Sequence, residues 1–124
     1  MGWPPEVGEL LPRAEEAAGI RTKLRLYCLD EFHESGGAKA LGFSQILGIT
    51  IESIDYLEAR IRGAILLHPI SAVRRQSPFG VACVVEFPLR GIGAHSHRVV
   101  LLRTVWELPD HASAPRLVTA FLRP

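Results

Sequence analysis

The chain has 124 residues, of which 48% are hydrophobic and 22% charged, and its formal net charge is +1. This length and apolar content predict one globular domain over residues 1–124 and exclude a disordered chain. No apolar run reaches the ~20 residues of a membrane-spanning helix. Two cysteines are typical of buried thiols in a reducing compartment, so we expect a cytoplasmic protein with no membrane partner.

The first half of the chain is predicted to be helical after an extended start. Apolar residues at helical spacing predict helices over residues 21–29 and 38–47, and a longer helix that begins after the N-cap Thr50. Ser53 stands where a capping box has an acid, so we expect an incomplete box. The apolar stripe of the longer helix is predicted to be Ile51, Ile54, Leu57, Ile61 and Ile65. The predicted parts are an extended lead-in (1–20), a helical part (21–68) and a sheet (70–124).

The second half has the alternation that is typical of strands. Strands are predicted over residues 79–87, 98–108 and 116–122, with a weaker one over residues 70–76 and a hairpin connection at residues 90–96. We therefore expect an α+β fold in which the N-terminal helices pack on one face of a C-terminal antiparallel sheet of three to five strands. In the strand 98–108, one face is predicted to hold Val100, Leu102, Thr104, Trp106 and Leu108.

Charge is distributed unevenly between the two halves. Residues 1–62 contain ten acidic and seven basic side chains, whereas residues 63–124 contain three acidic and seven basic ones. A basic half is suited to a face that binds phosphate. Because twelve of the fourteen basic residues are arginine, the pattern also fits a simple preference for arginine over lysine, and both interpretations stay open.

Several kinds of reactive site are not supported by the sequence. His95 and His97 are spaced to hold a metal, but they lie in a glycine-rich hairpin without nearby cysteine, and an exposed loop pair is the favoured interpretation. Ser35 lacks the strand–turn–helix context of a nucleophile. The run Gly36-Gly37-Ala38-Lys39 lacks the glycine spacing of a phosphate-binding loop. We predict neither a metal nor a cofactor.

A second group of residues is better suited to phosphate chemistry. His33 and Lys39 flank a Gly-Gly turn at a predicted helix start, where free backbone N–H groups favour an anion. Arg103 is a lone charge among Val and Leu on one face of the strand. The acidic residue near it in sequence on that face is Glu107. Fixed cations beside a histidine suit phosphodiester cleavage. The alternative is that Lys39 is a solvated helix residue and Arg103 an outward-facing edge charge.

The same residues carry a resemblance to a known family over most of the chain, from about residue 10 to residue 121. It is similar to an uncharacterised family of bacterial domains found in toxin–antitoxin-like loci and at the ends of larger secreted toxins. Its final strand also resembles that of the barnase–EndoU–colicin–RelE ribonuclease superfamily. The matching residues are Lys23-Leu24 and Tyr27, His33, Gly36-Gly37, Lys39-Ala40, Phe43, Pro78-Phe79-Gly80, Glu86 to Gly91, Arg103-Thr104-Val105-Trp106 and Pro115 to Phe121.

The resemblance implies a metal-independent endoribonuclease toxin. His33 would be the general acid or base, Lys39 and Arg103 would hold the scissile phosphate, and Thr119 would donate a hydrogen bond to it. Lys23 and Glu86 are weaker candidates. The expected partners are an RNA substrate and a small antitoxin or immunity protein.

Two departures from the family pattern keep other functions open. Acidic residues surround His33 and would repel RNA phosphate, and Phe121-Leu122 replaces a terminal Tyr-Pro, so a tyrosine hydroxyl is missing there. One alternative is a non-catalytic protein-binding module, either a neutralising partner or an inactive paralogue. The other is a structural domain that pairs through a sheet edge.

Overall fold

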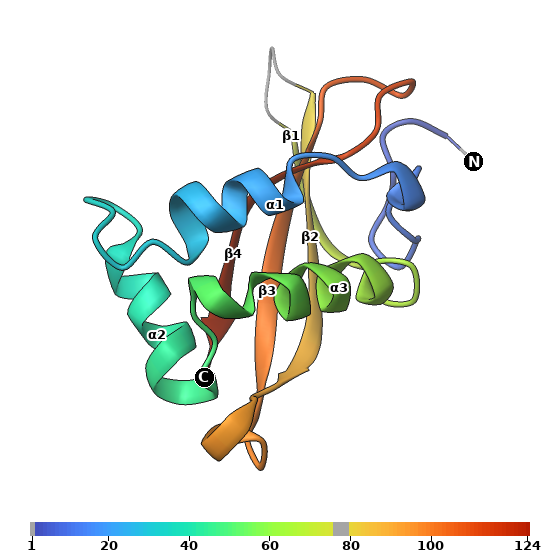
Figure 1. The fold of residues 1–124 in the computed structure, drawn as a ribbon. Helices are drawn as coiled ribbons and strands as arrows, with labels where there is room; N and C mark the ends of the chain where they lie inside the picture. Colours follow the sequence, from blue (N-terminus) through green and yellow to red (C-terminus); the bar gives the residue numbers. More distant parts are fainter. Residues whose placement is uncertain (1, 76–79) are drawn as a thin grey trace.

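The computed structural model describes residues 2–75 and 80–124 and shows an α+β fold, as predicted (Figure 1). Gln76 and the Pro78-Phe79 pair, which lie in the predicted strands or in the family motif, fall outside the described residues. The helices come first along the chain and the strands follow. The helices are α1 (Ile20–Lys23), α2 (Gly37–Leu47) and α3 (Ile54–Ala64), and the strands are β1 (Ile70–Arg75), β2 (Val81–Arg90), β3 (Val99–Leu108) and β4 (Arg116–Arg123).

The helical half agrees with the sequence pattern except in detail. The helix predicted over residues 21–29 begins at Ile20 and continues beyond α1 as a π-helical turn, Leu24–Cys28. A short 3-10 turn, Ile51–Ser53, precedes α3. The predicted incomplete capping box is wrong, because the hydroxyl of Ser53 accepts a hydrogen bond from the N–H of Thr50 and thus replaces the acid. Ile51 is also exposed rather than part of the buried stripe.

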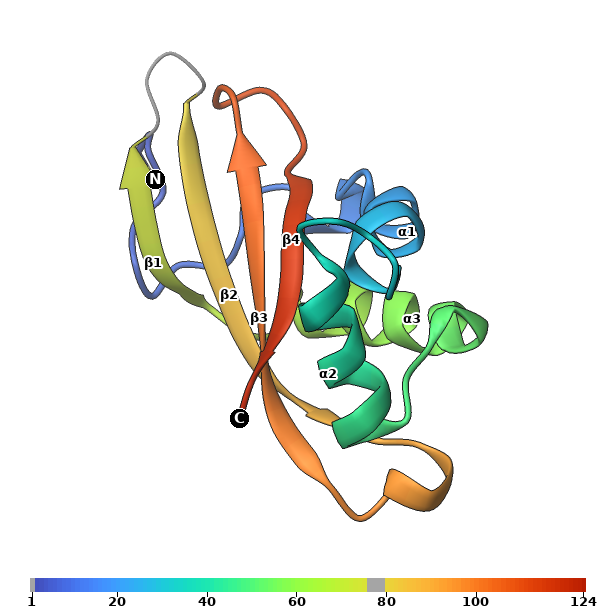
Figure 2. The same cartoon turned by 90° about the vertical axis from the view of Figure 1, so that its left-hand side faces the viewer.

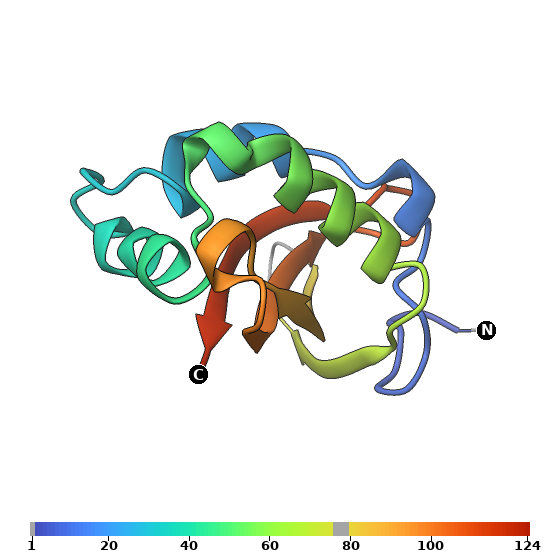
Figure 3. The same ribbon diagram turned by 60° about the horizontal axis from the view of Figure 1, so that its bottom comes forward.

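The strands form one antiparallel meander. Their order in space is β1-β2-β3-β4, so each strand pairs with its neighbour in sequence. The helices lie on one face of this sheet, and α2 lies alongside β4 (Figures 2 and 3). The opposite face is not covered by a described helix. The prediction of helices on one face of an antiparallel sheet is therefore confirmed.

The core lies between the helices and the covered face of the sheet. Phe43 of α2, Phe87 of β2 and Trp106 of β3 are fully buried there. Trp106 donates its indole N–H to the hydroxyl of Thr104, which donates in turn to the carbonyl of Val85. This chain satisfies two polar side chains that would otherwise be costly to bury. Cys28 and Cys83 are free and buried, as predicted.

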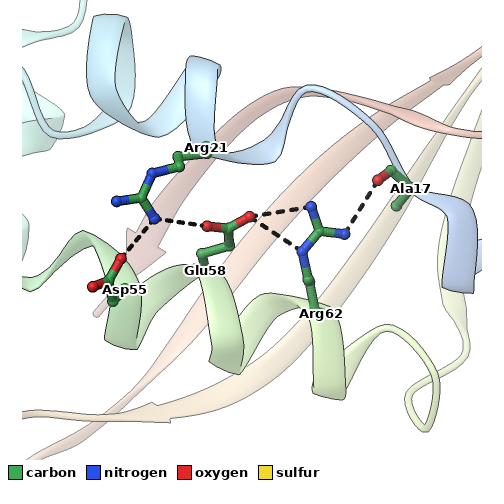
Figure 4. A network of polar contacts seen from close by, with 5 residues as sticks. All are labelled: Ala17, Arg21, Asp55, Glu58 and Arg62. Atoms are coloured by element: carbon green, nitrogen blue, oxygen red, sulfur yellow. Dashed lines mark hydrogen bonds and ion pairs between the residues drawn. The ribbon is translucent and has the colours of Figure 1, made fainter.

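A row of ion pairs joins the helices on the side away from the sheet (Figure 4). Arg21 of α1 contacts Asp55 at 2.6 Å and Glu58 at 3.0 Å, both on α3. Glu58 also pairs with Arg62, and Arg62 donates to the carbonyl of Ala17 in the lead-in segment. These pairs are largely exposed, and such pairs contribute about 0–1 kcal/mol each. They connect α1, α3 and the lead-in segment.

Candidate functional site

His33 lies in the turn that joins the π-helical turn to α2. Its Nδ1 accepts hydrogen bonds from the backbone N–H groups of Ser35 and Gly36, each at 3.1 Å. The imidazole packs edge-on against Tyr27, with 4.6 Å between the ring centroids. A Cβ at Gly36 would lie 2.8 Å from the Tyr27 ring, so glycine is needed for this packing. In the neutral ring the proton is therefore on Nε2.

Lys39 lies in the first turn of α2 but reaches the last strand. Its ammonium is 4.5 Å from the centroid of the Phe121 ring on β4. Such a contact is a cation–π interaction. Phe121 lies directly opposite Arg103 in the pairing of β3 with β4. Two of the residues predicted to hold phosphate, Lys39 and Arg103, thus flank the same aromatic ring.

Arg103 is paired with Glu86 rather than with Glu107. Its Nε lies 2.7 Å from Glu86 Oε2, and Nη1 of Arg123 lies 3.2 Å from the same oxygen. The hydrogen bond from Arg103 is the main reason that the pKa of Glu86 is lowered, with a further contribution from Arg123. Glu107 is four residues along the strand, about 13 Å away. Strand pairing places Glu86 opposite Arg103, which sequence neighbours alone do not indicate.

Thr119 lies beside the buried thiol of Cys28 in this structure. Its hydroxyl is close enough to lower the pKa of Cys28, yet it forms no hydrogen bond of standard geometry with the described residues. Burial is the largest effect on the thiol and raises its pKa, while the backbone at Ala120, the hydroxyl of Thr119 and the charges of Lys23 and Lys39 oppose the shift. The hydroxyl is buried, so its predicted contact with phosphate requires a rotation of the side chain.

The candidate residues fall into two groups. Near the turn, the ammonium of Lys23 is 5.9 Å from the centroid of the Tyr27 ring, which in turn contacts His33. On the sheet, Lys39 is brought together with Phe121, Arg103, Glu86 and Arg123. Within residues 2–75 and 80–124, no contact joins His33 to Arg103. Figure 1 shows the turn that carries His33 projecting beyond the β4 side of the sheet.

The uncovered face of the sheet contains a hollow of about 270 Å³. Its centre is apolar and basic side chains lie at its border. The sequence pattern did not indicate Arg74, Phe121 or Arg123 as site residues. Strict alternation from the buried Ile70 and Leu117 would place them on the covered face, and register shifts in the pairing of β1 with β2 and of β3 with β4 bring them to the open face instead. The hollow is lined by Ala72, Val73, Arg74, Ala82, Val84, Arg103, Val105 and Phe121.

The described residues form neither a metal-ligating cluster nor a membrane-spanning helix. Among the described residues, no three His, Cys, Asp or Glu side chains are grouped closely enough to hold a metal ion. His97 is exposed, whereas His95 is partly covered and lies close to Gly48. None of the described helices has both the length and the apolar character that crossing a bilayer requires.

Comparison with known families identifies the chain. Residues 10–124 match the model of a domain of unknown function, DUF6883. The chain belongs to this family. Neither a curated protein nor a solved structure matches it. The match includes the turn with His33 and the whole sheet of the DUF6883 domain, so both groups of candidate residues lie inside it.

The DUF6883 domain thus offers two kinds of chemistry at separate places. The turn presents one imidazole nitrogen in a fixed orientation. The open sheet face presents guanidinium groups around an ionised carboxylate, next to an apolar hollow. Guanidinium groups bind phosphate oxygens through paired N–H donors. An apolar surface between them is suited to a flat organic ring.

Proposed function

We propose that this DUF6883 domain is a metal-independent endoribonuclease toxin that cleaves RNA by attack of a ribose 2′-OH on the adjacent phosphate. One observation carries the proposal: the open sheet face holds Arg103 and Arg123 side by side on a single oxygen of Glu86, at 2.7 and 3.2 Å. This holds two positive groups in place before a ligand arrives. Preorganised cations of this kind stabilise the charge that develops on phosphate during cleavage.

The phosphate of RNA would bind to this pair of arginines. Both arginines contact Oε2 of Glu86, and each guanidinium has further N–H donors that can point to the open face. Lys39 adds a cation at Phe121, the strand partner of Arg103. The three basic side chains come from β3, β4 and α2, so the site exists only when the helical half has packed against the edge of the sheet.

The reaction requires two proton transfers. The proton of the 2′-OH passes to a base while its oxygen forms a bond to phosphorus, and the bond to the 5′ oxygen breaks as that oxygen takes up a proton. The products are a 2′,3′-cyclic phosphate and a free 5′-OH. His33 is proposed to donate the proton of Nε2 to the departing 5′ oxygen, since Nδ1 is occupied by backbone N–H groups. A water molecule would take up the proton of the 2′-OH. Because no contact joins His33 to Arg103 in the described residues, the turn with His33 would have to move toward β4 when RNA binds for Nε2 to reach the phosphate that the arginines hold.

A second function is favoured by a specific observation. Arg103 and Arg123 are already neutralised in part by Glu86, and the hydroxyl of Thr119 is buried. A surface of that kind is also suited to a non-catalytic module that docks an acidic protein. The two functions differ in one respect that can be measured, because only the ribonuclease depends on the 2′-OH of the ligand.

The deciding experiment is cleavage of single-stranded RNA and of DNA with the same sequence by the purified protein in the presence of EDTA. RNA should be cut and DNA left intact, because DNA lacks the attacking hydroxyl. H33A should reduce the rate by about 10²–10⁴-fold, the usual effect of losing a general acid or base. H97A is the matched control, since His97 is an exposed loop histidine, and it should cleave at the wild-type rate.

Induction in bacteria provides an independent check. The wild-type protein should slow growth, and H33A should relieve this effect. Cleavage of DNA, or loss of activity on chelation, would contradict the mechanism. An inactive wild-type protein with no effect on growth would favour the binding module, and replacement of the usual tyrosine by Phe121 would be the first cause to test.

A further inference from the structure

We propose that the hollow on the open sheet face is a nucleobase subsite that takes one unpaired base of the RNA strand. This inference rests on the proposed ribonuclease function and specifies how the strand lies on the domain. The hollow has a volume of about 270 Å³ and is formed by all four strands. It lies next to the arginine pair and not at the turn with His33.

Strand pairing arranges the lining side chains in rows across the sheet. Ala72, Val84 and Val105 lie opposite one another and form a central row without a charge. On one side, the row contains Arg74, Ala82, Glu107 and Arg116. On the other side, the next row contains Glu86, Arg103 and Phe121. Rows on one face are about 7 Å apart, so the apolar row has cations within reach on both sides.

This arrangement matches the two parts of a nucleotide. The flat face of a base can lie on Val84 and Val105, because a base has an apolar π-face and polar edges. Phe121 forms a wall of the hollow and the ammonium of Lys39 lies over its ring, which is how base-stacking aromatic residues are commonly placed beside cations. The phosphate of the same nucleotide then falls on the row that holds Arg103.

Charge favours a nucleic acid strand over other ligands of similar shape. Arg74 and Arg103 line the hollow, and Arg123 shares the charge of Glu86 with Arg103. The flanking rows also contain Glu107 and its strand partner Arg116, so basic residues outnumber the acidic residues Glu86 and Glu107 there. The side chains of Ala72 on β1 and Ala82 on β2 are small, so they leave the hollow open. Because the contacts are to the face of the ring and to phosphate, the subsite should accept different bases.

The inference is tested with 2′-O-methyl tetranucleotides, which cannot be cleaved by 2′-OH attack. The full chain is titrated with a tetranucleotide of normal bases and with one of equal charge that has an abasic unit at each position. The wild-type protein should bind the normal tetranucleotide about 10-fold more tightly, in line with the usual effect of losing one stacked base. Binding of the abasic strand measures the phosphate contacts alone.

A variant that fills the hollow tests whether the base binds there. A72L places a larger side chain on the floor at an exposed position and should abolish the preference for bases while leaving binding of the abasic strand unchanged. A94L makes the same exchange at an exposed position outside the hollow and should retain the preference. V84T keeps the shape of the floor but adds a hydroxyl, so it should weaken the preference even if A72L fails to fold.

The outcomes separate the two proposals. Equal affinity for both strands, together with active RNA cleavage, would overturn the base subsite and leave the ribonuclease proposal intact. A preference for bases that A72L and V84T leave unchanged would place the base elsewhere and also overturn the inference. If neither strand binds and RNA is not cleaved, the open face is not a nucleic acid site, and both proposals fail in favour of an acidic protein partner.

Discussion

The two faces of the sheet are built from the same four strands but carry different side chains. Facing the helices are fully buried apolar groups such as Phe87, Leu102 and Trp106. On the other face an apolar row lies between charged ones, with Glu86 and Arg103 in direct contact. Since successive residues of a strand point to opposite faces, each strand contributes to stability with one set of residues and to the candidate site with the other.

This division explains why the open face can carry charges without a large cost to the fold. A charged side chain on the covered face would lose its water and need a partner. Arg103 is only partly covered, and its partner Glu86 retains some exposure. We therefore expect substitutions at neighbouring positions of one strand to differ strongly in their effects. Two pairs of variants test this expectation, and a third measurement tests the ion pair on the open face.

The largest difference is expected between Trp106 and Val105. W106A removes the largest fully buried side chain and should lower the free energy of unfolding by about 3–5 kcal/mol, as large-to-small core substitutions do. V105A, one residue away on the open face, should cost about 1 kcal/mol or less. Urea unfolding of both variants checks this. Equal losses would show that the two faces are not energetically distinct.

A smaller difference is expected from exchanging hydroxyl and methyl groups. T104V removes the acceptor of the buried Trp106 indole N–H and should lower the free energy of unfolding by about 1–3 kcal/mol, the cost of an unsatisfied buried polar group. The reverse exchange on the open face, V105T, should change it by less than about 0.5 kcal/mol. Thermal unfolding of the pair is the measurement, and a stable T104V would show that the hydrogen-bond chain is unimportant.

The smallest effect is expected from the ion pair on the open face, and it should depend on pH. The pKa of Glu86 in the folded protein lies below its ordinary value of 4.5, chiefly because Arg103 donates to it. A carboxylate with a lowered pKa stabilises the fold above its ordinary pKa, and this contribution is lost as the pH falls through the lowered value. At pH 7, E86Q should be less stable than the wild type by about 0.5–1 kcal/mol.

The pH dependence provides the control for this last prediction. The difference between the wild type and E86Q should decrease as the pH falls below 4.5 and vanish once Glu86 is protonated. E107Q changes a carboxylate on the same face of β3 that forms no ion pair within the described part of the chain. It should show no such trend. A difference that stays constant down to acidic pH would mean that E86Q acts through packing rather than charge.

The sequence was most informative where one local rule decides the outcome. Alternation predicted which residues share one face of β3, and four of these five, Leu102, Thr104, Trp106 and Leu108, are inaccessible. Helical spacing likewise predicted α2 to within one residue at its start. The order of helices followed by strands was sufficient for the α+β class, because a sheet with one apolar face must be covered by the remaining elements.

What the sequence could not provide was the partner of each charged residue. Arg103 has Glu107 nearby in the chain, but the register of β2 against β3 brings it Glu86 instead. Lys39 belongs to a helix start and still reaches Phe121, 82 positions later in the sequence, because α2 packs along β4. Contacts of this kind depend on how elements are docked, and no local spacing rule specifies docking.

The sequence by itself thus determined the elements of this DUF6883 domain and indicated which basic residues are candidates for a phosphate site, since both follow from the type and spacing of side chains. The tertiary structure decided which of those candidates lie together. It joined Lys39, Arg103 and Phe121 at one edge of the open face and left His33 on its own turn beside Tyr27. The physical reason is that strand register and helix packing are settled by burial of the apolar core, and the charged side chains take the positions that this burial leaves them.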